Sequence, residues 1–179
     1  MTKDTERARE QARAQLASIV EMVAALECDY DRLDELREER GAINLAIAES
    51  AQDSNERELY LMELCKWDSE NLEELTSLND DAGDCESEED ARERIQEDAL
   101  SVEVRADWHE LTNDPVSPDE FQILLCTGGP AVRIIGELDE HLQPSRAWIE
   151  YQDWGTPWTE LVEFSDAILT YCQVFYFGE

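Results

Sequence analysis

The sequence predicts an α+β fold, because its hydrophobic pattern changes period near residue 100. Before that point apolar residues recur every three or four positions, the spacing of helices that bury one face. Beyond it apolar and polar residues alternate, as in strands that bury one face. We therefore expect an N-terminal antiparallel helical hairpin or bundle, then a four-stranded antiparallel β-meander with a C-terminal helix.

Three helices are expected in the first 78 residues. Gly41 follows the first one, as glycine often does at helix C-termini, and Ser54 is a favourable N-cap for the third. Long helices joined by short breaks are typical of an antiparallel hairpin, so we expect residues 1–78 to form one unit. The expected helices cover residues 5–39, about 42–52 and 54–78.

An acidic segment is expected to separate the two halves. Residues 66–100 hold 14 Asp and Glu against three Lys and Arg, the densest charge in the chain. Within it, Ser87 precedes three acids that would lie in the first turn of a short helix, where the helix dipole favours negative charge. We expect residues 79–100 to form an acidic linker and a short helix that ends near Ala99.

The remaining residues, 101–179, are expected to form the sheet and the last helix. The sequence Thr127-Gly128-Gly129-Pro130 is typical of a turn between two strands. Trp154 and Trp158 flank a rigid Gly-Thr-Pro connection, and we expect them to close the core rather than to form an exposed edge for a partner. The expected strands cover residues 102–106, 121–126, 131–138 and 145–153, and the expected helix covers about 159–175.

The charge balance limits the classes of partner that the chain can bind. The chain carries 45 Asp and Glu against 14 Lys and Arg, a formal net charge of −31. Such an excess destabilises a folded chain through self-repulsion. It would also repel nucleic acid phosphates and anionic membrane surfaces, so neither is an expected partner. A strongly basic protein surface is the expected partner, because its binding would offset the repulsion.

Neither a cofactor nor a metal is expected. The five cysteines are widely spaced and include no Cys-x-x-Cys pair, so zinc ligand spacing is absent. Asp84 stands where a calcium loop that began at Asn79 would need glycine. The segment Met1–Arg7 lacks the apolar stretch of a secretion signal. Reduced cysteines and no such stretch together predict a cytoplasmic location.

The C-terminal half resembles a known group of proteins. The segments Glu120–Ile134 and Tyr151–Glu160, with the Phe-Tyr-Phe-Gly-Glu end, resemble acidic proteins of phages and mobile elements over about residues 98–179. The resemblance implies a genetic setting, the bacterial host of a phage, but no particular chemistry. By charge alone the chain is also similar to phage DNA-mimic inhibitors of restriction and CRISPR enzymes.

These observations predict a non-enzymatic nucleic-acid mimic, an anti-restriction or anti-CRISPR inhibitor that occupies the DNA- or RNA-binding surface of a host defence complex. Carboxylates on successive helical turns lie about 5.4 Å apart, and each DNA strand carries one phosphate per about 3.4 Å. An acidic helix would therefore fit a cleft built for DNA. The expected contact residues are Asp68, Glu70, Glu73, Glu74, Glu89, Glu93, Glu97, Glu137, Asp139, Glu140, Glu150 and Asp153.

Two other functions remain open from the sequence. An adaptor or assembly protein would dock, or form a homodimer, through the N-terminal helices, and its acidity would serve only solubility. An enzyme would need a nucleophile such as Cys126 with His109 or His141 as base. No sequence motif favours that pair, so an enzyme is not expected. The identity of the target and the oligomeric state are likewise open.

Overall fold

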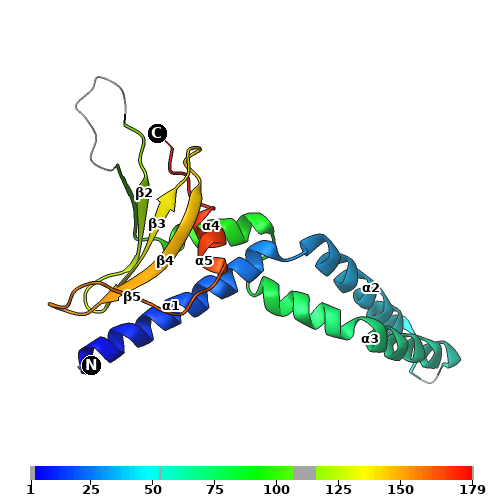
Figure 1. Ribbon diagram of the computed structural model, residues 1–179. Coiled ribbons are helices and arrows are strands. Elements are labelled where there is room, and N and C mark those ends of the chain that lie inside the picture. The colour runs from blue at the N-terminus through cyan, green and yellow to red at the C-terminus, as the bar shows by residue number, and fades with distance from the viewer. Residues whose placement is uncertain (1–2, 53, 107–115, 179) are drawn as a thin grey trace. The chain divides into compact units, whose positions relative to one another are not determined.

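The computed structural model describes residues 3–52, 54–106 and 116–178, and it has the predicted α+β class (Figure 1). The chain divides into two compact units, residues 24–90 and residues 1–23 with 91–179. The first 23 residues thus group with the sheet. The elements are α1 (Lys3–Glu27), α2 (Tyr30–Glu49), α3 (Asn55–Ala82), α4 (Glu88–Asp98), β1 (Ser101–Arg105), β2 (Glu120–Cys126), β3 (Ala131–Leu138), β4 (Pro144–Gln152), β5 (Thr159–Glu160) and α5 (Ala167–Cys172).

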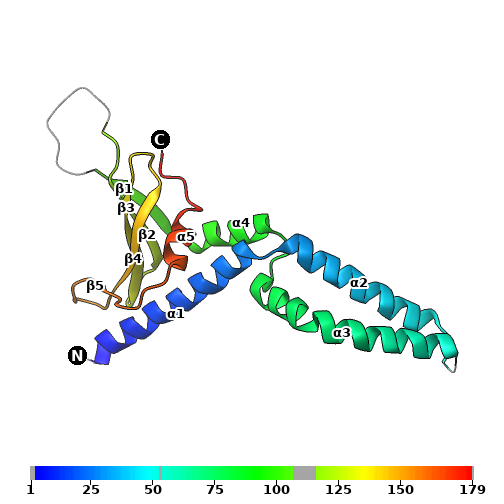
Figure 2. The same ribbon diagram turned by 45° about the vertical axis from the view of Figure 1, so that its right-hand side comes forward.

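The unit of residues 24–90 is an antiparallel hairpin of α2 and α3, which lie side by side in both views (Figures 1 and 2). Its core joins Leu33 and Leu36 of α2 to Leu75 and Ala82 of α3. These residues come from the half of the hairpin that is distant from the α2–α3 connection. Toward the closed end the packing is thinner, and several large apolar side chains there are exposed, namely Leu45, Leu59, Leu61 and Met62.

The single long helix expected over residues 5–39 is wrong, because the chain breaks at Cys28 and Asp29. The side chain of Asp29 accepts a hydrogen bond from the backbone N–H of Arg32, at 3.0 Å, and so caps a new helix. Gly41 lies inside that helix rather than after its end. The apolar stripe continues across the break, which is why periodicity alone predicted one helix. The N-cap at Ser54 is confirmed, since its hydroxyl accepts from the N–H of Arg57.

The second unit contains a five-stranded antiparallel sheet in the order β1-β2-β3-β4-β5. Burial alternates along β2, so Phe121, Ile123 and Leu125 face the core. Phe121 pairs with Gly136 across the sheet, and a Cβ at Gly136 would lie 2.1 Å from the Phe121 ring. Glycine is therefore needed there to admit the ring, which stacks against Phe177 with centroids 4.5 Å apart.

One face of the sheet is covered by residues 3–23 of α1, by α4 and by α5, which lie on the same side of it (Figure 2). The covered side chains include Ala12, Ile19 and Ile95. Tyr171 of α5 donates a hydrogen bond to Asp98 at 2.8 Å. Burial and this carboxylate raise the pKa of Tyr171 far above its usual range. The opposite face of the sheet carries polar and charged side chains.

The helix expected over residues 159–175 is much shorter. Thr159 and Glu160 form β5, and the N–H of Leu161 donates to the carbonyl of Ile149, at 2.9 Å, beside that strand. The free edge of β4 supplied backbone partners that the periodicity could not reveal. The helix itself is the six-residue α5.

The expectation that both tryptophans close the core is also wrong. Trp154 is 80% exposed, and its indole N–H donates to the carbonyl of Gly128 at 2.8 Å. Its ring covers Gly129, where a Cβ would lie 2.0 Å away. Trp158 is half-buried beneath the guanidinium of Arg133, 4.1 Å from its ring centroid. The two side chains therefore organise a turn and the polar face of the sheet.

Candidate functional site

The predicted contact acids fall on both units, and each unit is described by itself. Five belong to the hairpin unit and seven to the sheet unit. All but three are exposed, the exceptions being the half-buried Asp68, Glu150 and Asp153. The hairpin set is Asp68, Glu70, Glu73, Glu74 and Glu89, and the sheet set is Glu93, Glu97, Glu137, Asp139, Glu140, Glu150 and Asp153.

Several acids of α3 are partly neutralised by neighbours. Asp68 accepts from Arg40 at 3.0 Å, and Glu74 accepts from two nitrogens of Arg32 at 3.0 Å. The hydrogen bonds from Arg32 lower the pKa of Glu74, so this carboxyl stays ionised in mildly acid solution. These acids hold the two helices of the hairpin together, which the sequence did not indicate.

The bases of the hairpin unit are all engaged inside it. Residues 24–90 hold 23 Asp and Glu against five Lys and Arg. Arg37 donates to Asn79 and Arg57 to the carbonyl of Ile47, while Lys66 lies 3.9 Å from Glu70. Arg32 and Arg40 bind acids as described above. Of the 22 acids that the structure describes here, 21 are exposed, so the hairpin presents negative charge on a surface whose positive charges already have partners.

The acids of the sheet unit have more local roles. Asp139 accepts from the N–H groups of His141 and Gln143, at 2.8 and 2.9 Å, and these bonds lower its pKa. Asp153 accepts from the N–H of Trp154 at 2.7 Å. Both carboxylates therefore build turns. Glu140 is exposed in the first of these turns, and Glu93 and Glu97 are exposed on α4.

The polar face of the sheet gathers the three arginines of residues 101–179. Each pairs with a glutamate on a neighbouring strand: Arg105 with Glu120, Arg133 with Glu150 and Arg146 with Glu137. Strand register places Arg105, Glu120, Glu137 and Arg146 in one row across four strands. Glu120 and Glu137, two like charges at the centre of the row, are therefore flanked by the two arginines. The arginines offset the repulsion between the two glutamates.

A second row contains the most enclosed ion pair. Arg133 donates from Nε and Nη2 to Glu150, at 2.9 and 2.7 Å, and from Nη1 to Gln122 at 2.6 Å. Trp158 covers the flat side of the same guanidinium. With three nitrogens bonded and one face stacked, Arg133 is a structural residue of this face rather than a free cation.

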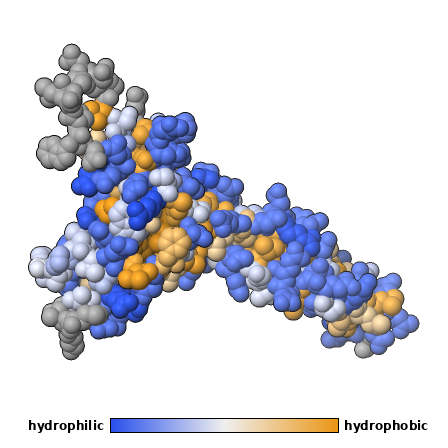
Figure 3. Space-filling model, in the orientation of Figure 1, coloured by the Kyte–Doolittle hydropathy of each residue, from blue (hydrophilic) through white to orange (hydrophobic). Residues whose placement is uncertain are grey.

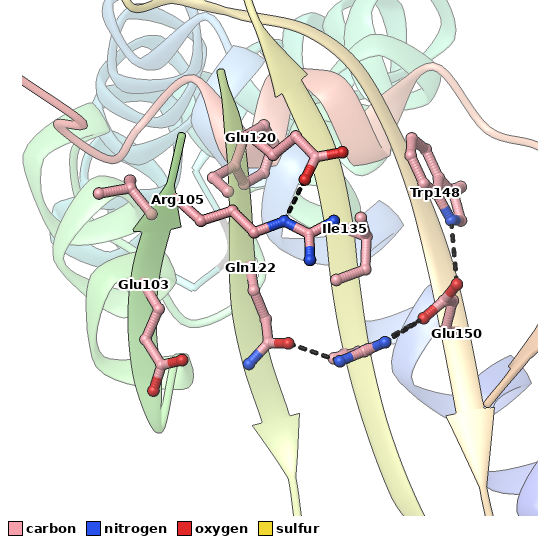
Figure 4. A pocket seen from close by; sticks show the side chains of 10 residues that line it. Glu103, Arg105, Glu120, Gln122, Ile135, Trp148 and Glu150 are labelled. Atoms are coloured by element: carbon pink, nitrogen blue, oxygen red, sulfur yellow. Dashed lines mark hydrogen bonds and ion pairs between the residues drawn. The ribbon is translucent and has the colours of Figure 1, made fainter. Parts of the chain in front are cut away.

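Between these two rows lies a hollow of about 280 Å³ (Figure 4). Its floor is the row Glu103, Gln122, Ile135 and Trp148, which lies between the two rows that contain the arginines. Figure 4 shows Arg105 with Glu120 on one side and Gln122 and Glu150 on the other. The guanidinium of Arg133 donates to both Gln122 and Glu150. The hollow lies at the lower edge of the range of roughly 300–1,000 Å³ that is typical of small-molecule sites.

The sequence predicted Glu137 and Glu150 as contact acids but did not predict that three arginines share their face of the sheet. The signal was present, because alternation in the strands places Arg133 and Ile135 opposite the core-facing Ile134. The grouping of the three arginines could not be predicted from this alternation, because it depends on the register in which the strands pair.

The residues considered for metal binding and for nucleophilic chemistry can be located in part. Among residues 3–52, 54–106 and 116–178, no group of three His, Cys, Asp or Glu is placed to hold a metal ion. Burial raises the pKa of the Cys126 thiol, the opposite of what a nucleophile needs. His141 is exposed in a turn, and His109 lies outside the described residues. No helix in these ranges has the length and apolar character required to cross a bilayer.

Comparison of the chain with protein families, with curated proteins and with solved structures finds no match.

Proposed function

We propose that this chain is a non-enzymatic nucleic-acid mimic that binds the DNA- or RNA-binding surface of a basic host protein. One observation carries the proposal: all five bases of the hairpin unit have partners within it, while 21 of its 22 described acids are exposed. A solubility role alone would not require the positive charges to be used in this way.

The charge density of the hairpin supports the proposal. Residues 30–82 carry 16 Asp and Glu against five Lys and Arg. The longer helix, with 28 residues, is about 42 Å long at 1.5 Å per residue. The hairpin therefore presents about one net negative charge per 4 Å, close to the value of about 3.4 Å for one strand of DNA. A groove that accepts a nucleic acid strand would meet a similar field.

The setting comes from the resemblance of residues 98–179 to acidic phage and mobile-element proteins. From that setting and the charge we infer that the partner is a host defence complex, of the restriction or CRISPR kind, in a bacterial cytoplasm. The five cysteines, all free in the structure, are compatible with a reducing compartment.

The experiment is a competition assay with purified restriction and CRISPR complexes and labelled nucleic acid. We expect the chain to displace the nucleic acid, and the competition to weaken steeply as salt is raised from about 0.05 to 0.5 M, because screening shortens the reach of charge. Affinity that does not change with salt would contradict mimicry.

An adaptor function is the second candidate, and a separate observation favours it. Leu59 and Met62, near the closed end of the hairpin, are 64% and 69% exposed. Figure 3 shows hydrophobic side chains at that end of a hairpin whose visible face is mostly hydrophilic. A partner bound there would be held by apolar contacts, so its complex would resist salt.

A further inference from the structure

We propose that the hollow on the polar face of the sheet binds one arginine side chain of the partner protein. The proposal rests on the proposed function in one respect, that the partner is basic. It adds a defined anchor to a surface that otherwise acts through distributed charge.

The charge of the hollow points to a cationic occupant. Its lining contains Arg105 and Arg133, and their partners Glu120 and Glu150 neutralise both. Glu103 is exposed at one end of the floor, opposite Gln122. Among the described residues no ion pair engages it, so the lining has one uncompensated negative charge. A carboxylate at this place suits the planar fork of a guanidinium, which can donate two parallel hydrogen bonds.

The floor suits the rest of an arginine side chain. Ile135 and Trp148 line the hollow with apolar surface, and the methylene groups of arginine bury well against such surface. The same face already contains two arginines in this arrangement, since Arg133 lies over Trp158 at 4.1 Å and Arg146 over Trp148 at 5.1 Å. The guest guanidinium would bind the carboxylate of Glu103 on β1, while Trp148, at the β4 end of the same row, contributes apolar surface.

The test is an NMR titration of the full chain with N-acetyl-arginine amide, with N-acetyl-citrulline amide as an uncharged probe of similar shape. We expect arginine amide to shift the indole N–H of Trp148 and the side-chain amide of Gln122 along a saturable curve. Citrulline amide should give no saturable shift. Equal effects of the two probes, or shifts spread over exposed acids without saturation, would overturn the proposal.

Two variants and a control make the test specific. Glu103→Gln removes the uncompensated charge and should raise Kd by up to about fivefold, the upper end of the range of an exposed ion pair. Ile135→Phe fills the hollow without changing its charge and should abolish saturable binding, with circular dichroism confirming the fold. Glu10→Gln removes the same charge from an exposed site on α1 and should leave Kd unchanged. If Glu103→Gln and Glu10→Gln behave alike, the anchor is wrong.

The outcomes also separate this proposal from mimicry. One outcome is that the natural chain shows no saturable arginine binding while the Ile135→Phe variant still competes with nucleic acid. That outcome would contradict the arginine site and leave the mimic intact. Saturable arginine binding without competition would contradict the mimic and leave the arginine site intact.

Discussion

Arg133 and Glu150 form the most enclosed ion pair of the sheet unit, with side chains only 22% and 20% exposed. The guanidinium donates twice to one carboxylate oxygen and once to Gln122, and it lies on the ring of Trp158. This arrangement uses one of only three bases in residues 101–179 to hold three side chains in place. It therefore gives the polar face of the sheet a fixed geometry.

Removing Arg133 should destabilise the sheet unit more than removing Arg146. Arg133→Leu leaves Glu150 half-buried without its counter-ion, which we expect to cost about 1–3 kcal/mol, between the values of exposed and buried pairs. Arg146 is 68% exposed and 3.3 Å from Glu137, so Arg146→Leu should cost less than about 1 kcal/mol. Urea unfolding measures both. Equal losses would show that the Arg133 network adds no stability.

The contact of Trp154 with Gly129 should appear as coupling between the two residues. Gly129→Ala places a Cβ 2.0 Å from the indole at a φ of +85°, so it should destabilise by more than about 2 kcal/mol. Trp154→Ala alone should cost about 1 kcal/mol, the value of the lost hydrogen bond to Gly128. In the Trp154→Ala background the alanine should cost less, because the steric clash is gone. A strictly additive double-mutant cycle would contradict this account.

The exposed acids of the hairpin should act collectively. Reversing Glu38, Glu49, Glu63 and Glu73 to Lys changes the net charge of the hairpin by about eight and touches none of the ion pairs described above. We expect loss of competition with nucleic acid and retention of the helical circular dichroism spectrum, since all four acids are exposed. The same four residues changed to Asp keep the charge and should keep the competition. Competition by the reversed variant would show that the hairpin is not the mimic surface.

Glu163 should stabilise the sheet unit in a pH-dependent way. Its carboxylate accepts from Arg13 at 2.5 and 2.9 Å and from Arg9 at 3.1 Å, and these arginines lower its pKa in the folded chain. A depressed pKa contributes stability above the unfolded pKa, near 4.3, and that contribution is lost as pH falls through the folded value. Urea midpoints of the natural chain and of Glu163→Gln should therefore differ at pH 7 and converge as the pH falls through the folded pKa of Glu163. A difference that persists in acid would indicate packing instead.

Salt should stabilise the chain as a whole. With a net charge of −31, self-repulsion acts over a Debye length of about 30 Å at 0.01 M salt and about 3 Å at 1 M. We expect Tm to rise over this range, in sodium chloride as in potassium chloride. A Tm that falls with salt would mean that ion pairs such as Arg32–Glu74 outweigh the repulsion.

The sequence by itself determined the α+β class, because hydrophobic periods of 3.6 and 2 report which face of a helix or strand is buried. It also placed the Ser54 N-cap and the strands from residue 121 to 152 within about one residue. It failed at Asp29, where a local cap outweighed a continuous apolar stripe, and after Trp158, where the free edge of β4 converted an expected helix into β5 and an irregular segment.

The candidate site divides in the same way. The excess of acid is a property of composition and needed no structure. Only the tertiary structure decided which acids are free, because the pairing of Glu74 with Arg32 and of Asp68 with Arg40 depends on how α2 and α3 align. The hollow beside Glu103 depends on register across four strands, and a shift of one residue would turn Ile135 toward the core and remove it. Local sequence specifies elements, whereas contacts between residues distant in the chain specify the site.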